Sequence, residues 1–241
     1  MSRRQSDATN RLLSLMSPAD FALLAPDLVL TPLPHGAVLA EPDEPIDHVY
    51  FPQSGIVSIV AVSPEGLEVE AGIVGREGLA SPAPVLLADS APNKVNVQLE
   101  GDAWRMDRQA FDHALTQSAT LRALLVKYLQ TLIVQTTYTA LSNAVHSVDE
   151  RLARWLLMCD DRIDAGEMAL THEFMSVMLA VRRPSVTTAL HVLAGNGFIR
   201  TRRGCVIIHN RSAMEQFAGD AYGKPEAAYL RLIGEMRPPV T

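Results

Sequence analysis

The chain has 241 residues, of which 48% are hydrophobic and 20% charged, and its formal net charge is −6 at pH 7. This length allows two domains with separate cores, and the composition is that of a globular protein, which excludes a chain disordered throughout. No stretch reaches the ~18 apolar residues of a membrane span, and no apolar run follows the basic start of the chain. We therefore expect a cytoplasmic protein without a signal peptide or membrane partner.

The first half of the chain predicts short helices followed by a small β domain. Residues 9–25 are typical of two helices, the second capped by Ser17 with Pro18 at its first position. From about Val29, β-branched runs such as Ile56–Val62 alternate with turn signals at regular spacing. Strands spaced in this way favour a compact sandwich or barrel. We expect this domain to span residues 1–110.

The longest helical pattern runs from Phe111 to Asn143 and carries a broad apolar stripe. Because one small barrel covers so wide a stripe poorly, we expect the helix to pair with a second copy of itself, as in a two-fold homodimer. The alternative is burial of the stripe within one subunit. The dimerisation segment is placed at residues 111–146, with four side chains at the seam: Leu121, Leu125, Tyr128 and Leu132.

A new domain is predicted to begin at residue 147 and to extend to residue 241. Ser147 and Glu150 form a capping-box pattern, which marks the start of another helix. The bend between this helix and the preceding one is the expected hinge between the domains.

Residues 171–197 predict a helix-turn-helix. Thr171 is placed to cap a first helix, and Pro184 suits the first turn of a second helix that ends at Gly195-Asn196-Gly197. The second helix should expose arginines and short hydroxyls, which are residue types that reach phosphates and base edges in a major groove. The candidate DNA contacts here are Thr171, Arg182, Arg183, Ser185, Thr187 and Thr188.

Two short strands after this helix predict a basic wing. The strands at 198–200 and 205–208 are joined at Arg203-Gly204, and Arg200, Arg202 and Arg203 are further candidate DNA contacts. Between Leu170 and Ser212 six arginines face one acid, Glu173, so this stretch carries +5 in an otherwise acidic chain. Such a patch attracts the phosphates of double-stranded DNA, although many arginine clusters are simply solvated surface.

In their order, these elements resemble the Crp/Fnr family of bacterial transcription regulators. The matching motifs are Leu33-Pro34-His35-Gly36, His48-Val49-Tyr50-Phe51-Pro52, Gly75-Arg76-Glu77-Gly78 and Val181-Arg182-Arg183-Pro184-Ser185-Val186-Thr187, followed by the wing. The resemblance implies an α+β fold with a cyclic-nucleotide-binding-type β-roll, a long dimerisation helix and a C-terminal winged helix-turn-helix. It also implies a homodimer on a palindromic operator, with half-sites ~34 Å apart, and RNA polymerase as a partner.

The same resemblance raises the question of a ligand. Family members that bind cyclic nucleotides use an acid for the ribose and an arginine for the phosphate. Glu77 stands in the acid's position, but Asn93-Lys94 occupies the arginine's, and lysine lacks the bidentate fork that guanidinium offers to phosphate. Thr136 and Thr137 lie where some relatives contact the nucleobase. The alternative is that they are ordinary half-exposed polar residues of the helix. We therefore expect no tight cyclic AMP complex, and leave another small ligand open.

No catalytic, metal or cofactor motif is present. The seven histidines are scattered, the two cysteines are too few for a four-cysteine centre, and no phosphate-cradling glycine loop precedes a helix. The oxygen-sensing relatives' cysteine cluster is also missing. We expect a transcription regulator and not an enzyme; the alternative is a ligand-sensing or scaffold protein whose DNA module is degenerate.

Overall fold

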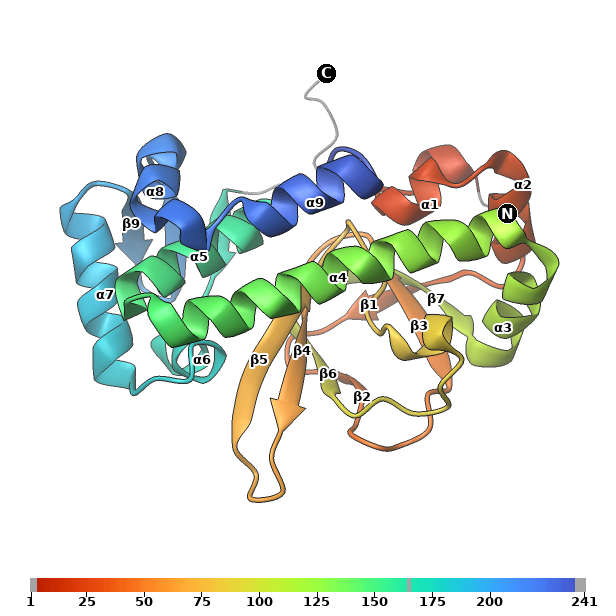
Figure 1. The fold of residues 1–241 in the computed structure, drawn as a ribbon, viewed down its shortest axis with the longest axis horizontal. Coiled ribbons are helices and arrows are strands. Elements are labelled where there is room, and N and C mark those ends of the chain that lie inside the picture. The colour runs from red at the N-terminus through yellow and green to blue at the C-terminus, as the bar shows by residue number, and fades with distance from the viewer. Residues whose placement is uncertain (1–3, 164–165, 237–241) are drawn as a thin grey trace.

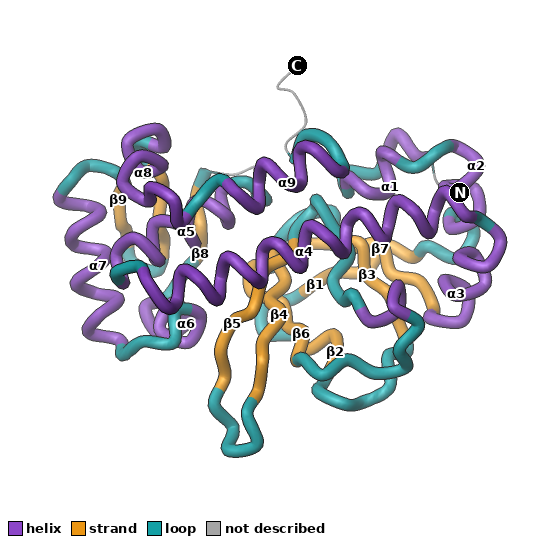
Figure 2. Tube along the Cα trace, in the orientation of Figure 1, coloured by secondary structure: helices purple, strands orange, loops and turns teal. Residues whose placement is uncertain are grey.

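The chain folds into an N-terminal β-roll, a long helix across it, and a C-terminal winged-helix domain (Figures 1 and 2). The computed structural model describes residues 4–163 and 166–236. Its N-terminal part has the helices η1 (Gln5–Asp7), α1 (Arg11–Leu15), α2 (Pro18–Leu24) and η2 (Ala83–Leu86). The strands of the roll are β1 (Val29–Leu33), β2 (Val38–Ala40), β3 (His48–Pro52), β4 (Ile56–Val62), β5 (Glu68–Val74), β6 (Lys94–Leu99) and β7 (Gly101–Asp107).

These strands form two antiparallel sheets, in the orders β1-β7-β3 and β2-β6-β4-β5. Phe51, Val57 and Met106 are almost completely buried in cores of the β-roll, whereas Ile73 of β5 is buried in the core that continues into the C-terminal domain. Burying such side chains contributes roughly 1.5–3 kcal/mol each. The predicted β-roll is confirmed, although some of the proline and glycine signals, such as Pro32 in β1 and Gly72 in β5, lie within strands.

The helical pattern from Phe111 onward is two helices instead of one, α3 (Arg108–Gln117) and α4 (Ala119–Val145). Ser118 lies between them with an extended backbone, and its hydroxyl caps α4 by accepting a hydrogen bond from the Leu121 amide at 3.1 Å. The same hydroxyl donates to the carboxylate of Asp20 in α2. The long helix therefore begins later than the apolar pattern indicates, because a serine cap competes with helix continuation.

Helix α4 has two apolar faces, one turned toward the β-roll and one exposed. The four residues predicted for the dimer seam lie on the face turned toward the β-roll. Leu121, Leu125, Tyr128 and Leu132 are each at most 7% exposed and pack in the same core as strands of the β-roll. These four side chains, expected at a dimer seam, are buried within the subunit instead. The reason is that the roll, together with the C-terminal helix, covers more of α4 than a small barrel alone would.

The C-terminal domain begins at the predicted capping box. Ser147 accepts a hydrogen bond from the Glu150 amide, and the Glu150 carboxylate accepts one from the Ser147 amide at 2.8 Å. The helices are α5 (Val148–Asp160), α6 (His172–Met178), α7 (Arg183–Gly195), α8 (Arg211–Ala218), η3 (Gly219–Ala221) and α9 (Lys224–Leu232). The strands β8 (Glu167–Ala169), β9 (Ile199–Arg202) and β10 (Cys205–Ile208) form one sheet in the order β8-β10-β9.

The last helix returns to the β-roll instead of ending on the winged-helix domain. Helix α9 runs beside α4 and ends near α1 (Figures 1 and 2). The Arg11 Nε donates to the Glu235 carbonyl at 3.0 Å, so the segment after α9 is hydrogen-bonded to α1. Within the described ranges, no helix has the length and apolar character needed to cross a membrane.

Candidate DNA-binding surface and nucleotide slot

The helix-turn-helix is built by α6 and α7, which pack through Met175, Met178, Val186 and Leu190. Thr171 caps α6, since its hydroxyl accepts a hydrogen bond from the Phe174 amide at 3.2 Å. The turn between the helices requires a left-handed residue, and Ala180 takes this conformation with φ of 50°. The helix-turn-helix predicted from the sequence is therefore present, with α7 as the second helix.

The solvent-facing side of α7 carries the polar residues predicted for it. Arg182, Arg183 and Thr188 are exposed, as is Thr171, while Ser185 and Thr187 are half-buried. The Arg183 Nη1 lies 3.6 Å from the Glu173 Oε2. Both side chains are well exposed, at 65% and 73%, and surface pairs of this kind contribute at most about 1 kcal/mol. Arg183 is therefore available to a stronger partner such as a phosphate or a guanine edge.

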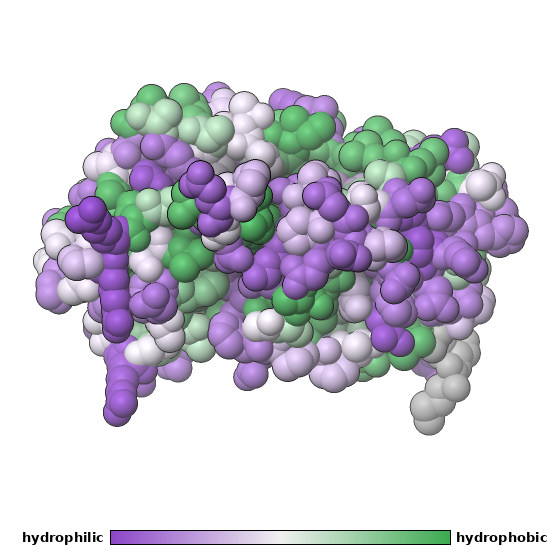
Figure 3. Space-filling model, turned by 90° about the horizontal axis from the view of Figure 1, so that it is seen from below, coloured by the Kyte–Doolittle hydropathy of each residue, from purple (hydrophilic) through white to green (hydrophobic). Residues whose placement is uncertain are grey.

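The wing adds the second part of this surface. Arg200, Arg202 and Arg203 are exposed around Gly204, which has φ of +70° at the turn of the hairpin. Arg202 makes only a loose 3.9 Å pair with Glu167. In the view from below, hydrophilic side chains project at the end of the molecule that carries α7 and β9 (Figure 3). Strand β8, which widens the wing sheet, was not predicted.

Arg211, counted above in the basic stretch, has a structural role instead. Its guanidinium contacts Asp160 at 2.5 Å, Asp161 at 2.6 Å and Glu215 at 2.8 Å, which ties α8 to the end of α5. Because three carboxylates already neutralise this guanidinium, it is a poor candidate for a phosphate contact. Five of the six arginines therefore remain as candidates.

The slot between strand β5 and α4, where the resemblance places a nucleotide, is occupied by the chain's own side chains. The Gln135 amide donates to the Ile73 carbonyl at 3.1 Å and accepts from the Ile73 amide at 2.7 Å. The Tyr128 hydroxyl donates to the Leu79 carbonyl at 3.1 Å. A Cβ on Gly78 would lie 2.1 Å from that hydroxyl, so the backbone here is shaped to admit the tyrosine.

Glu77, the candidate ribose ligand, is buried in an ion pair. Its Oε1 accepts a hydrogen bond from the Arg162 Nε at 2.7 Å, and its Oε2 accepts one from the Gly75 amide at 2.9 Å. Both charged side chains are 2% exposed. The Tyr229 hydroxyl of α9 donates to the Glu77 carbonyl at 2.7 Å. Neither carboxylate oxygen is free for a sugar hydroxyl in this arrangement.

The other candidate ligand residues do not converge on Glu77. Asn93 and Lys94 are half-buried at the start of β6, where the Lys94 Nζ is 3.0 Å from the Glu68 Oε1. Thr136 and Thr137 lie on the exposed side of α4. The cavity beside Glu77, Tyr128 and Gln135 holds about 10 Å³, which is room for about one water. These residues do not fit a cyclic nucleotide in the arrangement described.

Sequence reasoning missed Arg162, Gln135 and Tyr229. Each acts through a contact with a residue at least 62 positions away, as in the pairs Arg162–Glu77 and Gln135–Ile73. No local pattern marks such residues. A charged side chain near the end of a predicted helix is ordinarily solvated.

Comparisons with known proteins identify the two domains. Residues 30–118 match the family model of the cyclic nucleotide-binding domain, and residues 150–217 match that of the Crp-like helix-turn-helix domain. No curated protein sequence matches the chain significantly.

Several solved structures share the fold. FixK2 from Bradyrhizobium japonicum is 17% identical, with a TM-score of 0.65 over 78% of this chain and 96% of that one. A CRP-family transcriptional regulator from Thermus thermophilus is 20% identical, with a TM-score of 0.63 over 78% and 96%. The c-di-GMP-responsive global regulator CLP of Xanthomonas campestris is 16% identical, with a TM-score of 0.63 over 80% and 99%.

Proposed function

Since the chain belongs to the Crp/Fnr family, with a cyclic nucleotide-binding domain followed by a Crp-like helix-turn-helix domain, we propose that it is a homodimeric transcription regulator of a palindromic operator. The observation that carries this proposal is the exposure of Arg183 on α7 and of Arg202 and Arg203 on the wing. A recognition helix in the major groove and an adjacent hairpin on the sugar-phosphate backbone use these two kinds of contact. RNA polymerase is the expected further partner.

The outer face of α4 supports the homodimer. Exposed residues recur there at alternating spacings of three and four, which is the period of a coiled-coil seam. They are Ala123, Val126, Gln130, Ile133, Thr137, Ala140 and Ala144. Val126 is 52% and Ile133 59% exposed in the single subunit. A second copy of α4 would cover these apolar side chains and would set the separation of the two recognition helices.

The proposal does not require a cyclic nucleotide. Tyr128 and Gln135 occupy the slot, and Glu77 is paired with Arg162. We propose that the slot contributes to the rigidity of the subunit instead of binding an effector. We assign the chain no catalytic role, because the structures that it resembles are transcription regulators.

In vitro selection from a random DNA library tests this function. We expect an inverted-repeat site, bound by two subunits per duplex, with an affinity that falls steeply as salt rises because several phosphates are neutralised. Binding that is indifferent to sequence and salt would contradict the proposal and favour a sensor or scaffold with a degenerate DNA module.

A further inference from the structure

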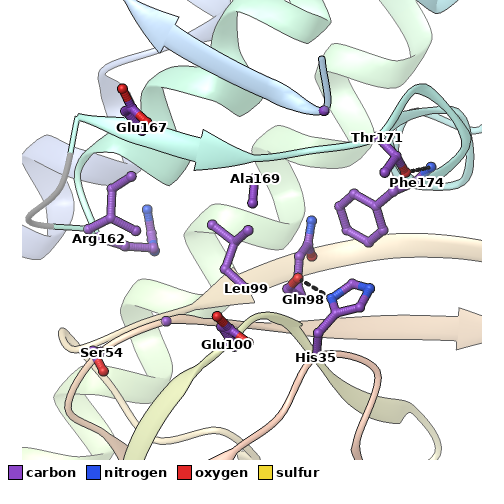
Figure 4. A pocket seen from close by; sticks show the side chains of 13 residues that line it. His35, Ser54, Gln98, Leu99, Glu100, Arg162, Glu167, Ala169, Thr171 and Phe174 are labelled. Carbon is purple, nitrogen blue, oxygen red and sulfur yellow. Dashed lines mark hydrogen bonds between the residues drawn. The ribbon is translucent and has the colours of Figure 1, made fainter. Parts of the chain in front are cut away.

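A large open cleft lies between the β-roll and the winged-helix domain, away from the slot beneath α4. Its volume is about 600 Å³, within the ~300–1,000 Å³ of typical small-molecule sites. Gln98, Leu99 and Glu100 line it from the end of β6. Glu167 and Phe174 line it from β8 and α6, so the two domains face each other across the cleft (Figure 4).

We propose that this cleft is the effector site of the regulator and that it takes a small amphipathic organic molecule without negative charge. The inference rests on the proposed function in one respect, namely that DNA binding is the output. It differs from the family model in the place of the ligand, because the nucleotide slot is closed by Tyr128 and Gln135.

The walls of the cleft provide an apolar floor. Leu99 is 9% exposed, and Ile163 and Phe174 are half-buried at its surface. Part of each side chain thus faces the cleft while the rest packs in the core. An aliphatic or aromatic body of a ligand would cover these parts and remove apolar surface from water, which favours binding.

A buried polar group at the wall lacks a partner. Gln98 is 1% exposed, and its Oε1 lies against the Ser58 hydroxyl. Its Nε2 has no hydrogen-bond partner among the described residues, is closed off from solvent, and points toward the winged-helix side in Figure 4. A buried donor without an acceptor is unfavourable, so a ligand acceptor that met this amide after a shift of the Gln98 side chain would gain a hydrogen bond.

The charges at the cleft select against anions. Glu100 and Glu167 are exposed at its edges, on opposite domains. Arg162 also lines the cleft, but its Nε is paired with Glu77. The Arg202 Nη1 is 3.9 Å from the Glu167 Oε1 and so offsets that carboxylate only weakly. A phosphate would be repelled by Glu100, whereas hydrogen-bond donors or a cationic group would be attracted.

A ligand in this cleft would bear directly on the wing. Gly204 of the wing turn lines the cleft, and its carbonyl accepts a hydrogen bond from the Leu170 amide at 2.9 Å. Since the ligand would contact both domains, it would stabilise one relative placement of the winged helix over others. The ligand can shift the equilibrium between these placements only as far as its affinities for them differ. DNA binding would change ligand affinity by the same factor.

Two naphthalene fluorophores test the site in the full chain: neutral Prodan and the anionic 1-anilinonaphthalene-8-sulfonate. We expect saturable, blue-shifted Prodan binding at one site per subunit, and at least tenfold weaker binding of the sulfonate. Ala169→Trp should weaken Prodan binding at least tenfold, because exposed Ala169 lines the cleft. The matched control is Ala61→Trp, at an exposed position of β4 that is not among the lining residues.

A charge variant keeps the test informative should Ala169→Trp fold poorly. Glu100→Lys should strengthen binding of the sulfonate probe at least fivefold relative to Prodan. Equal Prodan binding by the wild type and both tryptophan variants, or a probe preference that Glu100→Lys leaves unchanged, overturns the site. Because these titrations contain no DNA, their failure would leave the proposed DNA binding standing.

The effector role has its own readout. Saturating Prodan should change the affinity for the selected operator at least threefold in the wild type and in Ala61→Trp, and should have no effect in Ala169→Trp. Prodan that binds in the cleft and leaves the operator affinity of the wild type unchanged would contradict the effector role.

Discussion

The Glu77 carboxylate in the β-roll lies 2.7 Å from the Arg162 Nε just beyond the end of α5, and both side chains are closed off from solvent. The pair joins the two domains through the residue that the family resemblance suggested as a ribose ligand. The Arg162 Nη1 also donates to the Met158 carbonyl at 2.7 Å, which fixes the guanidinium on its own domain. An ion pair with these additional hydrogen bonds is well compensated for its burial.

Removing one partner of this pair should be costly. Glu77→Ala leaves the Arg162 charge buried without its partner, and we expect a loss of about 3–5 kcal/mol in the free energy of unfolding. Glu77→Gln/Arg162→Met, which removes both charges, should recover most of that loss. Urea denaturation of the three proteins measures this, with Glu173→Gln as a control at an exposed pair that should cost less than about 1 kcal/mol. A double variant as unstable as Glu77→Ala would contradict the explanation.

A second link between the domains predicts a pH dependence. The Trp155 Nε1 of α5 donates to Glu70 of β5 at 2.8 Å, and the Ser58 hydroxyl donates to the other oxygen at 2.7 Å. Burial raises the pKa of Glu70 to about 7, although both hydrogen bonds act to lower it. The folded state therefore holds this proton more tightly than the unfolded state, whose pKa is near 4.5. The stabilisation is present below pH 4.5 and is lost as the pH rises to about 7.

Glu70→Gln should remove this dependence, because the amide does not titrate. We expect the stability of the wild type relative to Glu70→Gln to fall by about 2–3 kcal/mol between about pH 5 and pH 8. Burial also raises the pKa of Glu226, but that group is common to both proteins and cancels. Chemical denaturation at the two pH values measures the difference, and Glu65→Gln, at an exposed turn, is the control. Parallel pH profiles for wild type and Glu70→Gln would contradict the assignment.

Features that depend on near neighbours in the chain could be predicted from the sequence. The capping box of Ser147 and Glu150, and the Thr171 cap before the helix-turn-helix, are contacts between near neighbours in the chain, and both are found in the structure. Which face of α4 stays exposed, and is therefore available to a second subunit, is not decided by local pattern. Leu121 and Leu125 belong to the broader stripe, but the β-roll covers them, whereas Ile133 remains exposed in the folded subunit.

Contacts between distant residues account for the rest. Nothing in the sequence around Tyr229 shows that α9 returns to the β-roll, where its hydroxyl meets the backbone of a residue 152 positions earlier. The helix-turn-helix family model ends at residue 217, so α9 also lies outside that comparison. A candidate ligand residue such as Glu77 is identified by its motif, but whether its carboxylate is free depends on Arg162.

Two arginines should have different roles on DNA. Arg183→Ala should cost about 1–3 kcal/mol at one base position per half-site and relax specificity there, if α7 enters the major groove as we propose. Arg202→Ala should weaken all DNA sequences alike and reduce the salt slope by about one unit per subunit. Binding of operator variants across a salt series separates the two effects. Arg231→Ala, at an exposed position of α9, is the matched control, and a uniform loss from both wing and helix variants would contradict base recognition by Arg183.

The outer face of α4 predicts how to separate the dimer. Ile133→Glu places a charge at the centre of the proposed seam and should convert the protein to monomers, with at least a tenfold loss of operator affinity. Leu230→Glu is the control, because Leu230 is similarly exposed, at 52% against 59%, but lies on α9. Sedimentation velocity measures the mass of each variant. A dimer that survives Ile133→Glu would place the subunit contact elsewhere.

The closed slot predicts that cyclic AMP is not a ligand. Calorimetric titration of the wild type should show no binding heat at micromolar ligand, because Tyr128 and Gln135 fill the space and Glu77 is paired. Gln135→Ala opens part of the slot but supplies no arginine for the phosphate, and Lys94 remains tied to Glu68 at 3.0 Å. This variant should therefore be equally silent, with circular dichroism confirming that it is folded. A submicromolar complex with the wild type would show that the Glu77–Arg162 pair opens to admit the nucleotide, and would place the effector beneath α4 instead of in the cleft between the domains.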